Sequence, residues 1–139
     1  MAVITPRVTT PILFDSSDSL LRFALRVDGT LCGLAGLLVA VTADPLGWLM
    51  GLSGTVTWLV GALLVGWGFA LYVLAVSRRL RRVGVAVLVG NVAFSVLTVG
   101  ALVAGVLPLT AVGVGIVWAF LAVGLGCAWL QYLGVRRLA

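Results

Sequence analysis

Four long apolar stretches divide this chain, and all of its positive charge lies on one side of them. The nine basic residues are Arg7, Arg22 and Arg26 before or at the start of the first stretch, Arg78, Arg79, Arg81 and Arg82 between the second and third, and Arg136 and Arg137 after the fourth. The connections on the other side, around Asp44-Pro45 and Leu107-Pro108, carry none. Because positively charged segments are translocated poorly, this pattern predicts four membrane crossings with both termini in the cytoplasm.

The composition fits such a topology. Of the 139 residues, 63% are hydrophobic and 9% are charged, whereas a soluble domain is about half apolar and about a quarter charged. Four spans of about 20 residues leave no room for a separate soluble domain. We therefore predict an all-α polytopic membrane protein, with a cytoplasmic N-terminal segment over residues 1–18 and a four-transmembrane-helix bundle over residues 19–139.

The predicted helices cover about residues 19–42, 55–77, 83–107 and 111–133. Asp44-Pro45 is expected to end the first helix, because proline cannot continue a helix interior. The segment after it, with Trp48, fits a short turn at the membrane interface. Thr110 is placed to cap the fourth helix. The arginine-rich connection between the second and third helices is so short that these two should be antiparallel neighbours, which gives two hairpins joined by that turn.

Several reactive residue types are missing from the chain, which has no His, Lys or Glu and only four Asp residues. Without histidine there is no His-based zinc, copper or haem site, and without lysine there is no Schiff base. We therefore expect no enzymatic activity, no catalytic residues, no cofactor and no metal. Nucleic acid is not an expected partner either, because no extramembrane fold would present the arginines to it.

The arginines are instead expected to fix the topology and to meet anionic lipid headgroups. The residues in this group are Arg78, Arg79, Arg81, Arg82, Arg136 and Arg137. Cys32 and Cys127 are the only cysteines, and both lie inside apolar stretches. We expect them to behave as small apolar residues. The alternative is that the two cysteines lie at similar depth in the membrane and form a redox pair.

Asp28 is the most unusual residue of the apolar stretches. It lies about 5 Å inside the predicted inner interface, and a carboxylate inside a membrane is costly and points to function. The alternative is a structural ion pair or hydrogen bond, with Arg78, Tyr72 and Gln131 as the partners within reach.

Asn91, Ser95 and Thr98 share one face of the third predicted helix. They fit hydrogen bonds between helices or the lining of a ligand or ion path. The candidate polar site comprises Asp28, Tyr72, Asn91, Ser95 and Gln131. All five fall in the cytoplasmic half, and the nearly apolar outer half argues against a pore through one monomer. A pocket open to the cytoplasm is compatible with this distribution.

Glycines at helical spacing predict close helix packing, either inside the bundle or against another subunit. The candidates are Gly29, Gly33, Gly36, Gly66, Gly68, Gly124 and Gly126. The pattern Val65-Gly66-x-Gly68-x-Ala70, followed by Arg78-Arg79-Leu80, recurs 58 positions later as Val123-Gly124-x-Gly126-x-Ala128, followed by Arg136-Arg137-Leu138. A duplicated hairpin, as in some transporters, would produce such a repeat, and so would chance in a chain of this composition.

Three segments carry a resemblance to known proteins: Asn91-Val-Ala-Phe94-Ser95, Leu107-Pro-Leu-Thr110-Ala-Val-Gly113, and Leu130-Gln131-Tyr132-Leu133-Gly134-Val135-Arg136-Arg137. In these segments the chain resembles an uncharacterised family of small four-helix integral membrane proteins of actinobacterial type. The resemblance covers the four helices and not the N-terminal segment. It implies a multi-pass protein of the bacterial cytoplasmic (inner) membrane and transfers no site residue.

Two functions follow as hypotheses. The first is a non-catalytic accessory or scaffold subunit of a larger respiratory or envelope-transport complex, with membrane lipids and other integral membrane subunits as partners. The small-residue faces and the apolar patch Ile12-Leu13-Phe14 motivate it. The second is a small homo-oligomeric transporter, or a lipid- or small-molecule-binding protein, that uses Asp28 and Asn91. A redox protein that uses the two cysteines is a third.

Overall fold

The computed structural model describes residues 16–139, and this part of the chain contains five helices and no strand. Four of them are long: α1 (Ser16–Val41), α3 (Gly54–Ala75), α4 (Leu80–Val103) and α5 (Ala111–Arg137). The short α2 (Ala43–Met50) connects α1 to α3. All four long helices are long and apolar enough to cross a membrane, so the chain is an all-α, multi-pass membrane protein. The apolar patch Ile12-Leu13-Phe14 lies outside the described residues.

The predicted boundaries need three corrections. Asp44-Pro45 does not end α1, which stops at Val41; both residues lie in the first turn of α2, where a missing proline N–H breaks no helical hydrogen bond. The predicted interfacial turn is therefore a helix, and it ends at Gly51 in the left-handed conformation (φ 84°). α4 begins earlier and ends earlier than predicted, and α5 continues through Arg137. The predicted cap at Thr110 is confirmed, because its Oγ1 accepts the Gly113 N–H at 3.1 Å.

α1 and α3 form the closest helix pair, through glycines that lie seven residues apart on each helix. A Cβ on Gly29 would lie 2.9 Å from the Gly68 carbonyl oxygen, and a Cβ on Gly36 would lie 2.6 Å from that of Gly61. The two helices therefore run antiparallel with backbone against backbone. Without a hydrophobic effect between helices in lipid, such close approach supplies the packing energy.

The glycine predictions meet different outcomes. Gly29, Gly36 and Gly68 pack closely. Gly33 takes part through its backbone, because a Cβ added on Gly68 would strike it as well as the Gly29 carbonyl oxygen. Gly66, Gly124 and Gly126 do not pack in the described chain, because an added Cβ at any of them meets nothing within 4 Å. Close packing occurs instead at glycines that the sequence analysis did not select: Gly47, Gly61, Gly84, Gly113 and Gly134. Of the matched glycines of the 58-residue repeat, Gly66 and Gly124 are thus alike, whereas Gly68 packs against α1 and Gly126 does not.

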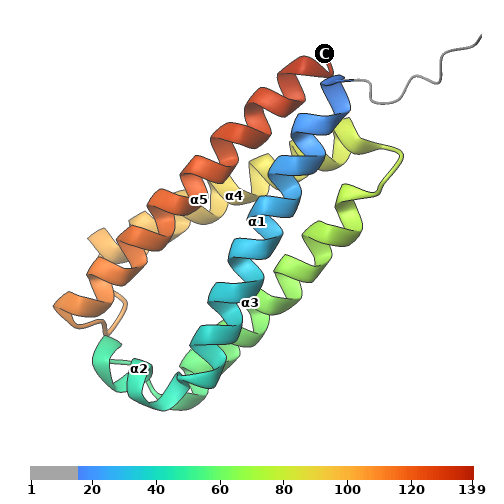
Figure 1. Cartoon of the computed structure of the whole chain (residues 1–139). Coiled ribbons are helices and arrows are strands. Elements are labelled where there is room, and N and C mark those ends of the chain that lie inside the picture. Colours follow the sequence, from blue (N-terminus) through green and yellow to red (C-terminus); the bar gives the residue numbers. More distant parts are fainter. Residues whose placement is uncertain (1–15) are drawn as a thin grey trace, which may run out of the picture.

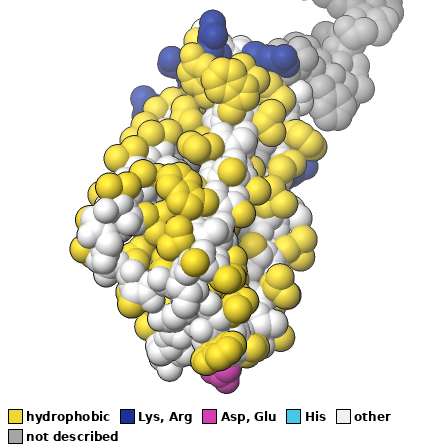
Figure 2. Space-filling model, turned by 90° about the vertical axis from the view of Figure 1, so that its left-hand side faces the viewer, with side chains coloured by type: hydrophobic (Ala, Val, Ile, Leu, Met, Phe, Trp, Pro, Cys, Tyr) yellow, Lys and Arg dark blue, Asp and Glu magenta, His cyan; other side chains and the backbone are white. Residues whose placement is uncertain are grey.

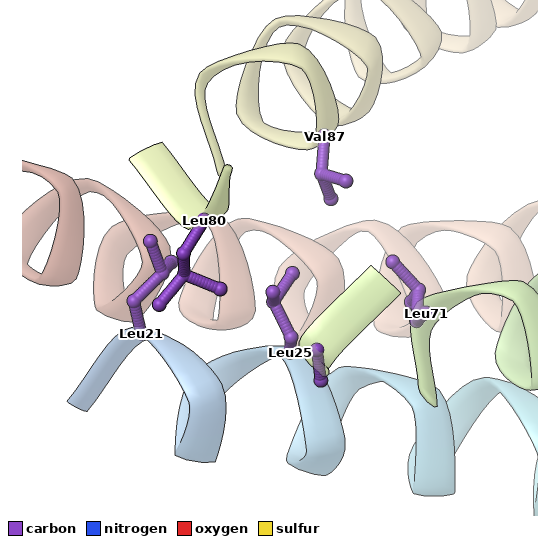
Figure 3. Packing of buried hydrophobic residues seen from close by; sticks show 6 residues of the cluster. Leu21, Leu25, Leu71, Leu80 and Val87 are labelled. Atoms are coloured by element: carbon purple, nitrogen blue, oxygen red, sulfur yellow. The ribbon is translucent and has the colours of Figure 1, made fainter. Parts of the chain in front are cut away.

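An apolar core lies at the arginine end of the bundle. Leu21 and Leu25 of α1, Leu71 of α3 and Leu80 and Val87 of α4 are buried together there, with Ala75 (Figure 3). Leu21 sits between the α4 and α5 backbones, since a Cβ on Gly84 or Gly134 would strike it at 2.6 or 2.8 Å. Arg22 donates to the carbonyls of Ala75 and Ser77 at the end of α3. All four long helices are tied together at this end.

Away from this core the helices diverge into two arms (Figure 1). One arm is α1 with α3 and the other is α4 with α5, and α3 has very little contact with α4 despite the short turn between them. The expectation that these two helices are close neighbours is therefore wrong. The far ends of the arms are bridged by α2, whose Leu49 and Met50 carbonyls accept hydrogen bonds from the Thr110 Oγ1 (2.6 Å) and N–H (2.9 Å).

The arginine side chains gather at one end of the molecule, and the surface between the ends is almost entirely apolar (Figure 2). Arg78, Arg79, Arg81 and Arg82 surround a shallow hollow beside Asp18 and Leu138. Asp44 lies at the α2 end. The charges thus occupy the ends of a bundle whose sides are apolar, as expected for helices surrounded by lipid.

Candidate functional site

Three polar side chains from three helices meet inside the bundle. Asp28 of α1 accepts hydrogen bonds at Oδ2 from the Gln131 Nε2 of α5 (2.7 Å) and from the Asn91 Nδ2 of α4 (3.2 Å). Asn91 Nδ2 also donates to Gln131 Oε1 at 3.1 Å, which closes a ring. We call Asp28, Asn91 and Gln131 the polar triad. It brings together three of the five residues that the sequence analysis had placed in one candidate polar site.

The triad is shielded from solvent. Asp28 is 4% exposed and Gln131 is 0% exposed. The Cys32 thiol, one turn along α1, donates to Asp28 Oδ1 at 3.4 Å. Within residues 16–139 no buried side-chain nitrogen or oxygen lacks a hydrogen-bond partner. Because these bonds join residues of three different helices, the triad ties α1, α4 and α5 together.

No arginine in the described part of the chain pairs with the Asp28 carboxylate. The only ion pair among the described residues joins Arg22 to Asp18 at 3.5 Å, and the three donors to Asp28 are two amides and a thiol. Arg78 was a possible partner in the sequence analysis, but it lines the hollow at the arginine end. The triad therefore places a carboxylate inside the bundle without a neighbouring cation.

A cavity of about 440 Å³ lies directly beside the triad. Asp28, Cys32 and Asn91 line one side of it, and the other lining residues come from α3, α4 and α5. The walls are largely apolar: Val60, Leu63, Leu64 and Trp67 of α3, Gly90, Phe94 and Ser95 of α4, and Phe120, Leu121 and Gly124 of α5. A concave, mostly apolar space with a few convergent polar groups is the usual form of a small-molecule site.

The cavity is separated from the arginine end. On α1, α3 and α4, every residue that lines it lies farther from that end than the buried core residues of the same helix. Leu25, Leu71 and Val87 are the core residues that lie nearest to the cavity lining along α1, α3 and α4. The sequence allowed a pocket open to the cytoplasm; the cavity beside Asp28 lies deeper in the bundle, and the hollow at the arginine end is lined by Arg78, Arg79, Arg81 and Arg82 and not by the triad. The opening is lateral, between the diverging α3 and α4, where Trp67 is 40% and Phe94 is 56% exposed.

No protein-family model, curated protein or solved structure matches this chain. The case for a function therefore rests on the residues of the triad and the cavity.

The structure places the other predicted residues elsewhere. Tyr72 does not reach Asp28; its hydroxyl bonds to Thr30 on the outer face of the α1–α3 pair, and the ring is 45% exposed. Ser95 lines the cavity, but its hydroxyl donates to the Asn91 carbonyl of its own helix at 2.8 Å. Thr98 likewise bonds to Phe94 of its own helix. Of the polar stripe on α4, only Asn91 thus makes side-chain hydrogen bonds to other helices, one to α1 and one to α5.

The two cysteines are buried and unpaired. Cys32 joins the triad as a weak donor, and Cys127 lies one turn before Gln131 on α5. Among residues 16–139 no three His, Cys, Asp or Glu side chains are grouped so that they could hold a metal ion.

The aromatic lining was not anticipated from the sequence. Trp67 and Phe120 lie in the middle of apolar stretches, although tryptophan prefers the membrane interface. Aromatic residues in the middle of a span were the one feature of the sequence that could have indicated the cavity lining. The sequence does not show which way these side chains point, because their direction depends on how far the two arms diverge.

Proposed function

We propose that this chain is a membrane protein that binds a small apolar or amphiphilic molecule in the cavity between its two arms. The observation that carries the proposal is that Asp28 and Asn91, two members of the polar triad, line an apolar cavity of about 440 Å³. A chain without His, Lys or Glu favours binding or transport over catalysis. We infer further that it resides in a bacterial inner membrane with its arginine end in the cytoplasm.

The cavity offers a direct test through its glycines. Gly90 lines it, and a Cβ there meets nothing within 4 Å, so Gly90→Leu should fill the cavity without disturbing the fold. Gly100 is a matched control on the same helix: it is also exposed, also free of neighbours within 4 Å of an added Cβ, and outside the cavity lining.

The measurement is thermal unfolding in phosphatidylcholine nanodiscs, with and without phenylbutanol as a neutral amphiphilic probe. A ligand that binds only the folded state raises the unfolding temperature. We expect the probe to stabilise the wild type and Gly100→Leu, and to leave Gly90→Leu unchanged. If all three proteins shift equally, the probe acts through the lipid and the proposal fails.

A second candidate is the accessory subunit of a larger membrane complex, acting with other integral subunits or with copies of itself. The open side of the cavity favours it, because a helix of another chain inserted between α3 and α4 would cover Leu63, Trp67 and Phe94. Apolar exposure to lipid costs little, so this surface does not by itself require a partner. Purification in mild detergent decides: a larger complex of fixed stoichiometry that Gly90→Leu dissociates would replace the ligand-binding proposal.

A further inference from the structure

The carboxylate in the cavity lining restricts the charge that a ligand can carry, in addition to the restriction that the apolar walls place on its shape. Asp28 belongs to the cavity lining, and its three hydrogen-bond donors are all neutral. Burying an ionised carboxylate without a cation is expensive. A ligand that brings a positive charge to Asp28 would offset this cost, whereas an anionic ligand would add to it.

Among residues 16–139, the protein's own cations do not take this place. Arg22 binds the carbonyls at the end of α3 and Asp18, and Arg26 is exposed on the other face of α1 from Asp28. The four arginines of the α3–α4 turn lie beyond the leucine core. The position beside Asp28 is thus open to a cation that a ligand supplies.

The walls suit an organic cation better than a metal ion. Trp67, Phe94 and Phe120 present aromatic rings to the cavity from three helices, and an aromatic ring attracts a desolvated cation over its face. A bare metal ion needs several oxygen ligands, and the lining offers oxygens only near Asp28, Asn91 and Ser95. An ammonium group on an apolar body uses both the carboxylate and the walls.

The route into the cavity adds a second constraint. The core closes the arginine end, and α2 bridges the opposite end through its bonds to Thr110. The gap between α3 and α4 faces the apolar flank of the bundle. A molecule that enters there must first dissolve in the lipid bilayer, so it needs an apolar body as well as its charge.

We propose that the cavity takes an amphiphilic organic cation, which enters from the bilayer between α3 and α4 and places its ammonium group against Asp28. This inference rests on the proposed function, namely that the cavity binds a small molecule at all. It adds the charge of the ligand, the residue that recognises it and the side from which it arrives.

The test compares two probes of nearly equal size, phenylbutylammonium and phenylbutanol, which differ in charge. Tryptophan fluorescence, with Trp67 in the cavity wall, reports their binding to the protein in nanodiscs of phosphatidylcholine, whose headgroups carry no net charge. Asp28→Asn keeps the size of the side chain and removes its charge. We expect it to weaken phenylbutylammonium binding by about tenfold or more and to leave phenylbutanol binding nearly unchanged.

Thr98→Ala is the control for a neutral loss of a hydroxyl on the same helix, because the Thr98 hydroxyl bonds within α4 and lies outside the cavity lining; it should leave the affinity of both probes unchanged. If Asp28→Asn fails to fold, Gly90→Leu replaces it and should abolish binding of both probes. Suppose that phenylbutanol binds, but phenylbutylammonium does not bind or binds Asp28→Asn as well as the wild type. That result overturns this inference and leaves the proposed function standing. If neither probe binds the wild type, both proposals fail.

Discussion

Gln131 donates a hydrogen bond of 2.7 Å to Asp28, although 103 positions separate the two residues in the chain. The bond joins α5 to α1, and Asn91 of α4 completes the ring. It lies between the packed leucine core and the cavity, where the two arms begin to diverge. The triad therefore serves as a structural tie, and its members Asp28 and Asn91 also line the candidate site.

Removing the Gln131 amide should weaken the fold. Gln131→Leu keeps a similar volume but takes away the shortest hydrogen bond to Asp28, and a buried bond to a charged group contributes about 1.5–3 kcal/mol. We expect the free energy of unfolding, measured by denaturant titration in detergent micelles, to fall by about that amount. Ser95→Ala, which breaks a bond within one helix, should change it by less than about 0.5 kcal/mol. Equal effects would show that the triad is not a tie.

The glycine contacts between α1 and α3 should tolerate no side chain. A Cβ on Gly61 would lie 2.5 Å from the Ala40 nitrogen, so Gly61→Ala must push the two backbones apart, at a cost of about 1–3 kcal/mol. Gly66→Ala on the same helix meets nothing within 4 Å, and the higher helix propensity of alanine should leave the protein as stable or more stable by up to about 1 kcal/mol. Thermal unfolding of the two variants, measured side by side, checks the opposite signs.

Thr110 caps α5 and also ties it to α2. Thr110→Ala loses the bond to the Gly113 N–H and the bond to the Leu49 carbonyl, and loss of a helix cap costs about 1–2 kcal/mol. We expect faster hydrogen exchange of the amides in the first turn of α5, and near-normal exchange in Thr110→Ser, which keeps the hydroxyl. Unchanged protection in the alanine variant would contradict the role of α2 as a bridge.

The orientation can be read from single cysteines. Thr55→Cys lies at the α2 end and Arg79→Cys at the arginine end, and both positions are exposed, whereas Cys32 and Cys127 are buried. A membrane-impermeant maleimide should label Thr55→Cys on intact cells, and Arg79→Cys only after the membrane is opened, if arginines stay in the cytoplasm. Labelling in the reverse order would invert the proposed topology.

The sequence by itself determined that the chain is helical and spans a membrane, and it located the long helices to within a few residues. It did so because these features depend on local properties: apolar runs of sufficient length, and breaks at charged and turn-forming residues. It also selected Asp28, Asn91 and Gln131, since polar residues in apolar stretches are conspicuous. It misplaced Tyr72, because spacing along a helix fixes a face but does not say which helix that face meets.

Only the tertiary structure decided how the helices pair and where the space between them lies. Gly61 packs against α1, while Gly126 packs against nothing in the described chain, although both are glycines in similar apolar surroundings. Gly66, on the same helix as Gly61, also meets nothing, so the difference comes from which face of a helix lies against a neighbour. The pairing of the helices is not set by their connections either, since α3 and α4 diverge in spite of their short turn. The divergence of α3 from α4 results from the packing of all four long helices around Leu21 and the triad. A cavity formed in this way is lined by residues from several helices, so no local sequence pattern predicts it.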